Sequence, residues 1–396
     1  MMHPTARLDT LCRAVNVGHV GPSSMHRDPN GVPFLMGKNV GFGVINHHNI
    51  ERVTEAFHRS QPKSVIRGGD VLVVRIGKSG QAAKVPESLG EANCSGLVII
   101  KEPKGVTADF LVYFLNSPIG RGHSLLQARG ATRLTLNTRS IAAARIPVPP
   151  LPEQKRIVGI LDEAFASIGT AKANAERNLQ NARALFESQL QAVITQGGPG
   201  WVQKTLGDVC SIARGGSPRP IQKFLTTAHD GINWIKIGDA TASGKYIHET
   251  EDKIIPEGAK RSRIVHDGDF LLSNSMSFGR PYIMRTTGCV HDGWLVLSNY
   301  ASHLDQDYLY LVLGSQGVFQ QFDRLAAGST VRNLNIELAS RVEIPVPPLE
   351  QQRNVARRLE TMSGETERLA FLYERKLGAL ETLKRSLLHQ AFTGQL

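Results

Sequence analysis

A nine-residue proline cluster occurs twice in this chain, and its spacing constrains the fold more than any other feature of the sequence. Residues 146–154 read Ile-Pro-Val-Pro-Pro-Leu-Pro-Glu-Gln, and residues 344–352 match them at seven of nine positions. The two copies lie 198 residues apart in a chain of 396 residues, so the repeat period is half of the chain. A repeat of this length predicts two copies of one structural unit.

A long helix is predicted after each proline cluster. Proline is tolerated at a helix start and disfavoured inside a helix, and none follows Pro152 before about residue 195 or Pro348 before about residue 393. Apolar or small residues recur there in steps of three and four, which is typical of a coiled-coil seam with one local slip in phase. The main predicted interface residues are Ile157, Leu161, Ile168, Leu179, Val355, Leu359, Met362, Leu369, Leu377 and Leu380. The alternative is that these are core helices of two separate domains.

The residues between the helices are mixed in character and indicate an α+β fold class. Gly69-Asp70 and Gly268-Asp269 are turn sequences, each followed by a predicted strand. Asp109 and Asp307 are expected to cap short helices over 110–115 and 308–313. The predicted organisation is a pseudo-twofold repeat in four regions, which are 1–145 (globular), 146–196 (proline cluster and helix), 197–343 (globular) and 344–396 (proline cluster and helix).

The positive charge of the chain is concentrated in its first globular region. The formal net charge is +11, and residues 1–151 alone hold 18 Lys and Arg against 9 Asp and Glu. A basic body of this kind indicates a polyanionic partner, most often nucleic acid.

The cysteines and the termini point to a reducing compartment. The four cysteines form no CxxC pair and no spacing with histidine that suits zinc, and Cys12 and Cys210 are repeat equivalents typical of small buried residues. The N-terminus has no apolar leader segment, and no apolar run is long enough to cross a membrane. A soluble protein of the cytoplasm is therefore expected.

Patterns that would indicate catalysis are incomplete. Gly77-Lys78-Ser79 resembles the end of a phosphate-binding loop, but that loop needs glycine where the chain has Leu72. His47 and His48 have no second cluster of metal ligands, and the three His-Asp-Gly stretches are turn sequences. The sequence predicts a protein without an active site or metal centre of its own.

The duplicated proline cluster, with a long helix behind each copy, resembles the specificity subunit of type I restriction–modification enzymes. The ending Ser-Leu-Leu-His-Gln-Ala-Phe-Thr-Gly at 386–394 is similar to the C-terminus of that family. The first copy departs from the family pattern at its start, where Arg7-Leu8-Asp9 stands against the more family-like stretch from Trp201 to Val209.

The resemblance implies that this chain recognises DNA while partner subunits carry out the chemistry. The two globular regions would be target-recognition domains, each reading one half of a split site in double-stranded DNA. The two helices would form an antiparallel coiled coil between them. Two methylation subunits carrying S-adenosylmethionine and two restriction subunits using ATP and Mg would dock on the chain, which would direct adenine methylation and restriction without cofactors of its own.

Candidate DNA contacts lie in or beside the turns after the repeated strands, where loops project from a scaffold. Arg and Lys can read guanine, Asn and Gln can read adenine, and other basic groups can hold phosphates. The candidates are Lys38, Asn39, Arg75, Lys78, Ser79 and Arg133 in the first globular region and Lys236, Asp239, Ser277, Arg280, Arg332 and Asn333 in the second. For each of them, a solvated surface residue is the competing interpretation.

Two other functional classes stay open at this point. A coiled-coil adaptor that binds protein without DNA specificity would show no preference among duplex sequences. A methyltransferase with an unrecognised cofactor site would bind S-adenosylmethionine in isolation.

Overall fold

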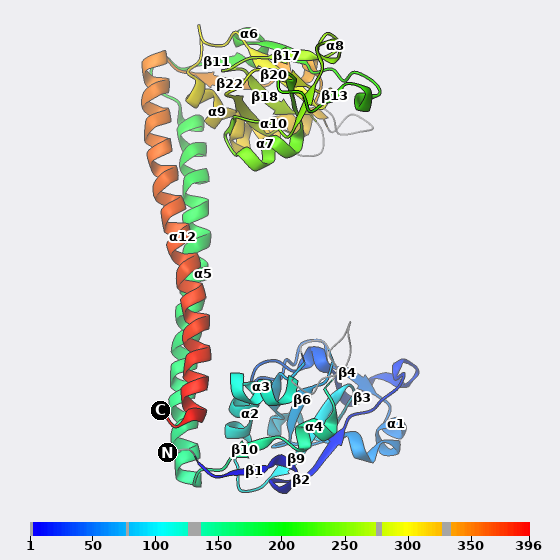
Figure 1. Ribbon diagram of the computed structural model, residues 1–396. Helices are drawn as coiled ribbons and strands as arrows, with labels where there is room; N and C mark the ends of the chain where they lie inside the picture. The colour runs from blue at the N-terminus through cyan, green and yellow to red at the C-terminus, as the bar shows by residue number, and fades with distance from the viewer. Residues whose placement is uncertain (1–2, 77–78, 126–135, 275–278, 327–333) are drawn as a thin grey trace. The chain divides into compact units, whose positions relative to one another are not determined.

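The computed structural model describes residues 3–76, 79–125, 136–274, 279–326 and 334–396 (Figure 1). The chain forms two compact units. Unit 1 comprises Met1–Glu176 and Glu374–Leu396, and unit 2 comprises Arg177–Tyr373. Each unit therefore contains one globular part together with a portion of both long helices.

The globular part of unit 1 contains two four-stranded sheets. The first is antiparallel throughout, in the order β2 (Cys12–Val17), β9 (Leu97–Pro103), β6 (Val71–Val74), β7 (Ala82–Lys84). The second has the order β4 (Glu51–Val53), β3 (Arg27–Leu35), β8 (Ala92–Cys94), β5 (Val65–Ile66), with β3 and β8 parallel. Its helices are α1 (Glu55–Ser60), α2 (Ala108–Asn116), α3 (Pro118–Leu125) and α4 (Thr138–Ala142).

Unit 2 enlarges the same plan to two five-stranded sheets. One has the order β12 (Ser211–Arg214), β21 (Trp294–Ser298), β18 (Phe270–Ser273), β19 (Pro281–Met284), β15 (Tyr246–Ile247). The other has the order β13 (Leu225–Thr226), β16 (Asp252–Ile254), β14 (Ile232–Ile235), β20 (Gly288–Val290), β17 (Arg263–Val265). Its helices are α6 (Leu206–Val209), α7 (Ile237–Ser243), α8 (Pro256–Ala259), α9 (Gln306–Gly314), α10 (Gln316–Ala326) and α11 (Ile336–Ser340).

The local turn predictions are confirmed, and the helix caps need a correction. Gly69 and Gly268 have φ values of +83° and +90° immediately before β6 and β18, a conformation that favours glycine. The predicted caps Asp109 and Asp307 instead lie in the first turns of α2 and α9. The observed caps are Thr107 and Asp305, whose side-chain oxygens accept hydrogen bonds from backbone N–H groups of the first turn. The two observed caps are again 198 residues apart.

Each proline cluster forms a short antiparallel ribbon before its helix. In unit 1, β10 (Arg145–Pro147) pairs with β1 (Thr5–Arg7). In unit 2, β22 (Glu343–Val346) pairs with β11 (Val202–Thr205) in the same register. The long helices then run over α5 (Leu151–Gln196) and α12 (Leu349–Thr393), within about two residues of their predicted bounds.

The long helices pair in an antiparallel manner within each unit. In unit 1, Ile157 and Leu161 near the start of α5 are buried with Leu388 and Ala391 near the end of α12. Lys172 and Glu381 form an ion pair of 2.8 Å farther along these helices. In unit 2, Leu190 near the end of α5 belongs to the same buried cluster as Ala356 and Leu359 near the start of α12. The predicted antiparallel pairing is therefore observed in both units.

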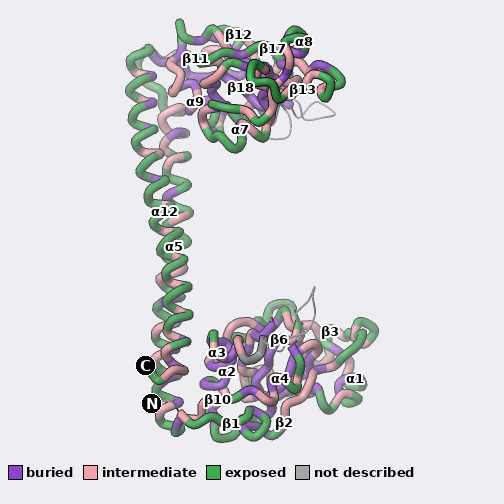
Figure 2. The backbone as a smooth tube through the Cα atoms, in the orientation of Figure 1, coloured by how far each residue is buried: buried purple, intermediate pink, exposed green. Residues whose placement is uncertain are grey.

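Burial along the two helices defines the seam (Figure 2). Most of the predicted interface residues are buried or partly buried, as shown by Ile157, Leu161, Ile168, Leu179, Val355, Leu359, Met362, Leu377 and Leu380. Leu369 is the exception, because 42% of it is exposed, and its assignment to the interface was wrong. Ala370, the next residue of α12, is partly buried instead. Seven-residue steps from Ala356 lead to Ala370 and Leu377, so this part of α12 keeps a regular heptad spacing without the slip that the sequence suggested.

Helix α2 packs between the first sheet and the long helices of unit 1 (Figure 1). Leu111 and Leu115 face the strands, whereas Phe110 and Tyr113 face the long helices. All four cysteines are buried with free thiols. The Cys12 and Cys210 thiols donate to the carbonyl groups of Leu8 and Leu206 at 3.2 and 3.0 Å, which confirms these cysteines as equivalent buried residues.

Across the part of the chain that the structure describes, no helix combines the length and the apolar character needed to span a bilayer.

Candidate functional site

The first predicted contacts, Lys38 and Asn39, lie in a short 3-10 turn after β3. Asn39 is 1% exposed; its amide accepts from the backbone N–H of Met36 at 3.0 Å and donates to the carbonyl of Asn46 at 3.3 Å. It therefore holds the loop together, contrary to the prediction that it contacts DNA. The Lys38 ammonium is half exposed and lies 2.8 Å from the carboxylate of Glu51.

The structure brings Arg75 and Ser79 together at the end of β6. Ser79 is 7% exposed, and its hydroxyl donates to the backbone carbonyl of Arg75 at 3.0 Å. Its role is to close the turn, so the prediction of a DNA contact at Ser79 also needs correction. The Arg75 guanidinium is partly buried and uses its Nε–H for the carbonyl of Leu136 at 3.2 Å. Lys78 and Arg133 lie outside the described residues.

Arg121 of α3 contacts the same turn at the end of β6, and the sequence did not predict this contact. Its Nη2 donates to the carbonyl of Ser79 at 3.2 Å, while its Nε is buried without a partner among the described residues. Arg121 is 42 residues from Ser79, and no periodic pattern or turn signal connects the two positions.

In unit 2, Lys236 and Asp239 stabilise the start of α7. The Asp239 carboxylate accepts from the backbone N–H groups of Lys236 and Glu251 at 2.8 and 3.2 Å. It therefore acts as a cap, and a DNA contact at this partly exposed residue stays a prediction. The Lys236 ammonium lies 3.0 Å from the carboxylates of Asp252 and Glu251, and hydrogen bonds to these two groups raise its pKa.

Arg280 is the predicted contact in unit 2 that stays open to solvent. Its side chain is exposed and, among the described residues, has no carboxylate within ion-pairing distance. It lines a cavity of about 760 Å³ together with Lys245, Tyr246 and Tyr310. The predicted contacts Ser277, Arg332 and Asn333 lie outside the described residues.

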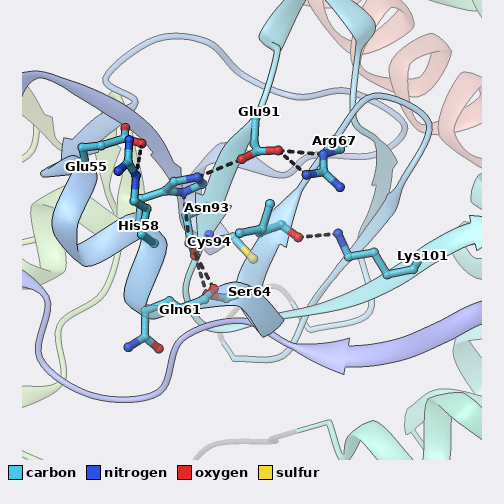
Figure 3. A network of polar contacts seen from close by, with 11 residues as sticks. Glu55, His58, Gln61, Ser64, Arg67, Glu91, Asn93, Cys94 and Lys101 are labelled. Atoms are coloured by element: carbon cyan, nitrogen blue, oxygen red, sulfur yellow. Dashed lines mark hydrogen bonds and ion pairs between the residues drawn. The ribbon is translucent and has the colours of Figure 1, made fainter.

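Unit 1 contains a polar network that the sequence did not reveal (Figure 3). Asn93 on β8 is completely buried and accepts from the Ser64 hydroxyl at 2.5 Å. His58 on α1 contacts Glu91 at 3.0 Å, and the hydrogen bonds from His58 and then from Arg67 lower the pKa of Glu91. These contacts join the segment of α1 and β5 to β8, which lies about thirty residues farther along the chain.

A buried ion pair lies at the edge of this network. The Lys101 ammonium is 2.8 Å from the carboxylate of Asp70, and the two side chains are 7% and 3% exposed. Lys101 also donates to the backbone carbonyl of Val65. Asp70 accepts from the backbone N–H groups of Arg67 and Glu102, so both charges are well satisfied.

The cavity beside this network does not form an anion site of net positive charge. It has a volume of about 310 Å³ and is lined by several basic side chains. Each of its Arg and Lys residues has a carboxylate partner, in the pairs Arg13–Glu102, Arg59–Glu55, Arg67–Glu91 and Lys101–Asp70. The network therefore fixes the inner structure of the globular part.

In each unit, a side chain of the globular part bonds to an acidic residue at an equivalent position of the long helices. In unit 1, the Tyr113 hydroxyl of α2 donates to Asp162 of α5 at 2.5 Å. In unit 2, the Lys245 ammonium lies 2.7 Å from Asp307 of α9 and 2.7 Å from Glu360 of α12. Asp162 and Glu360 are 198 residues apart. Burial acts to lower the pKa of Lys245, but its hydrogen bonds to Asp307 and Glu360 outweigh burial and raise it.

Comparisons with known proteins agree with this architecture. The family model described as "Type I restriction modification DNA specificity domain" matches residues 13–177 and 199–370, once in each half of the chain. The putative type I restriction enzyme MjaX specificity subunit of Methanocaldococcus jannaschii is 20% identical, over 94% of this chain and 89% of that protein. The EcoBI specificity subunit of Escherichia coli is 24% identical over 46% of this chain and 38% of that protein.

The fold is also found in a solved structure. A chain from a structure that addresses complex assembly and conformational transition of the type I R-M system superposes with a TM-score of 0.78 at 21% identity, covering 100% of this chain and 98% of that one. None of these comparisons supports a DNA-independent adaptor. The resemblance carried by the two proline clusters is confirmed, and the chain belongs to the family of type I restriction–modification DNA specificity domains.

Proposed function

We propose that the chain reads a bipartite DNA site, with one half-site bound by each globular part, and so directs the methylation and restriction subunits of a type I complex to their target. The observation that carries this proposal is one structural plan with two different surfaces. The ribbons, helix caps and helix anchors recur at a spacing of 198 residues, whereas the loops around Lys38 and Lys236 hold different partners. Two globular parts that share a fold but read different bases would define two dissimilar half-sites.

Contacts to DNA would come from candidate cations that form no ion pair among the described residues. Among the described residues, the two Nη atoms of Arg75 and the guanidinium of Arg280 make no hydrogen bond to the backbone, so they can donate to guanine O6 and N7 or to phosphate. Lys38 and Lys236 are already paired with carboxylates, so DNA phosphate would have to displace Glu51 at Lys38, and Glu251 and Asp252 at Lys236. We therefore assign the stronger DNA roles to Arg75 and Arg280.

The chemistry of the complex would reside in partner subunits. Two methylation subunits would supply S-adenosylmethionine and methylate adenine, and two restriction subunits would supply ATP-driven cleavage with Mg. This chain would act as the recognition subunit, without a cofactor of its own, in the cytoplasm where the target DNA is found.

Mapping of methylated positions tests the proposal directly. Genomic DNA from cells that express the chain with its methylation subunit should carry a two-part methylation motif that is absent from cells lacking the chain. Replacing residues 197–343 with the corresponding part of a relative should change one half of the motif and leave the other half unaltered. A continuous motif, or a motif that is the same without the chain, would contradict the proposal.

A further inference from the structure

An apolar cavity of about 340 Å³ lies in unit 1 between the β1–β10 ribbon, α2 and the two long helices. We call it the His3 cavity. Its walls are largely aromatic, with Phe110 and Phe114 from α2 and Phe392 from the end of α12. His3 and Arg145 also line it. An apolar cavity of about 150 Å³ can hold benzene, so this one has room for a larger ring.

The second repeat shows which kind of ring belongs at this position. Strand β1 pairs with β10 through Thr5 and Pro147, and β11 pairs with β22 through Gln203 and Pro345. Thr5 and Gln203 are 198 positions apart, as are Pro147 and Pro345. The residues two places before Thr5 and Gln203 are therefore also repeat equivalents. That residue is His3 in unit 1 and Trp201 in unit 2.

Trp201 shows how an indole packs at the equivalent position in unit 2. Its ring meets Tyr308 edge to face, with ring centroids 6.4 Å apart, and Tyr308 is the repeat equivalent of Phe110 in the cavity wall. Its indole Nε1–H donates to the side-chain oxygen of Gln351 at 2.9 Å. The equivalent of Gln351 in unit 1 is Glu153, which also offers side-chain oxygens as acceptors.

The Glu153 carboxylate can serve as the acceptor for such a ring. Arg156 donates to both of its oxygens at 2.8 Å, and this hydrogen bonding lowers the pKa of Glu153, so the group is ionised at neutral pH. A carboxylate has about four lone-pair sites and can accept a further N–H. An aromatic ring that carries an N–H donor therefore suits both the aromatic walls and the acceptor at the position equivalent to Gln351.

We propose that the His3 cavity receives the indole of a tryptophan side chain carried by the methylation subunit. This inference rests on the proposed function. The cavity is built from the proline-cluster ribbon, α2 and the long helices, and none of the candidate DNA contacts lines it, so its occupant would come from a protein subunit and not from DNA. Unit 2 already holds its own Trp201 at this position, so the partner's tryptophan would dock on unit 1 alone and make the two docking sites unequal.

The test uses the full chain, with N-acetyl-tryptophanamide as the probe and calorimetry as the readout. The wild-type chain should bind the probe, and His3→Trp, which places the chain's own indole in the cavity, should weaken binding roughly tenfold or more. Lys63→Trp, which adds an indole at an exposed position that does not line the cavity, is the matched control and should retain binding. The fluorescence of the new tryptophan in His3→Trp should be that of a buried indole, which verifies that the cavity has been filled.

The same variants are then titrated with the purified methylation subunit. Weaker assembly for His3→Trp, with Lys63→Trp unaffected, would support the proposal. Absence of probe binding would overturn it, and probe binding without any change in assembly would equally exclude a partner tryptophan and leave a free aromatic molecule as the occupant. Methylation mapping stays informative in both cases, since the chain can define a bipartite motif without this contact.

Discussion

Gln154 and Gln352 are completely buried and make the same three hydrogen bonds in the two units. Their Oε1 atoms accept from the backbone N–H groups of Thr107 and Asp305, at 2.8 and 2.7 Å. Their amide nitrogens donate to equivalent carbonyl groups, in the pairs Gly105 with His303 and Pro149 with Pro347. The last glutamine of each proline cluster therefore fastens the start of a long helix to the cap of α2 or α9.

Replacing either glutamine with alanine should destabilise its own unit. Gln154→Ala leaves a buried N–H and buried carbonyl groups without partners, at a cost of about 2–4 kcal/mol in the free energy of unfolding. Gln180→Ala, at an exposed position of α5, is the control and should change that free energy by less than about 0.5 kcal/mol. Hydrogen exchange should show faster opening of α2 in Gln154→Ala and of α9 in Gln352→Ala. Equal effects on both units would argue against a local role for each glutamine.

The corrected seam can be tested with two leucines of α12. Leu359 is 2% exposed and Leu369 is 42% exposed. Leu359→Ala should lower the free energy of unfolding by about 2–5 kcal/mol, because it opens a cavity in a packed core. Leu369→Ala should lower it by less than about 0.5 kcal/mol. Urea unfolding followed by tryptophan fluorescence is a suitable measurement, since all three tryptophans of the chain lie in unit 2. A large loss in Leu369→Ala would restore the seam first expected from the sequence.

The Asp70–Lys101 ion pair should be important for the globular part of unit 1. Asp70→Asn leaves a buried ammonium without its counter-charge, which typically costs about 3–5 kcal/mol. The double variant Asp70→Asn with Lys101→Met removes the buried charge and should recover a large part of that loss. Urea unfolding measured by hydrogen exchange of β6 and β9 provides the readout. Additive losses in the double variant would show that the two side chains do not interact.

The stability of unit 2 should fall in mildly acidic solution because of His291. This side chain lies between the rings of Trp234 and Trp294, and its Nδ1 accepts from the backbone N–H of Gly293 at 2.9 Å. Burial lowers the pKa of His291, with a smaller opposing effect from Asp292. The unfolded chain, with a histidine pKa of about 6.5, therefore binds protons more readily than the folded chain.

The stabilising contribution of neutral His291 is present above about pH 6.5 and is lost as the pH falls below that value. Tryptophan fluorescence should report a lower unfolding midpoint at about pH 5.5 than at about pH 7.5. The variant His291→Gln should show a smaller difference between the two pH values. An unchanged difference in that variant would assign the pH dependence to other groups.

Arg75 and Arg280 should affect DNA binding in ways that separate phosphate contacts from base contacts. If an arginine holds phosphate, its replacement by alanine should reduce the slope of log affinity against log salt by about one and weaken all sequences alike. If it reads a base, the loss should be about 1–3 kcal/mol and confined to one position of one half-site. Lys155→Ala removes one exposed charge from α5 and is the matched control. Binding that is unaltered in both arginine variants would contradict their proposed roles.

Periodicity and composition were sufficient to predict the plan of this protein. The 198-residue repeat, the helices after Pro152 and Pro348 and the strands after Gly69 and Gly268 follow from short-range rules of proline, glycine and apolar spacing. These features are local, because each depends on residues within a few positions of one another. The family resemblance rested on the same local patterns.

Only the tertiary structure decided which polar side chains remain available. Asn39 and Ser79 have residue types that suit DNA contact, but the fold buries both side chains, whereas Asp239 stays partly exposed. The buried pair of Asp70 and Lys101 joins residues 31 positions apart, which no periodic pattern connects. Burial and side-chain pairing depend on how distant segments pack, and for this reason the sequence by itself determined the repeated scaffold while packing determined its functional surfaces.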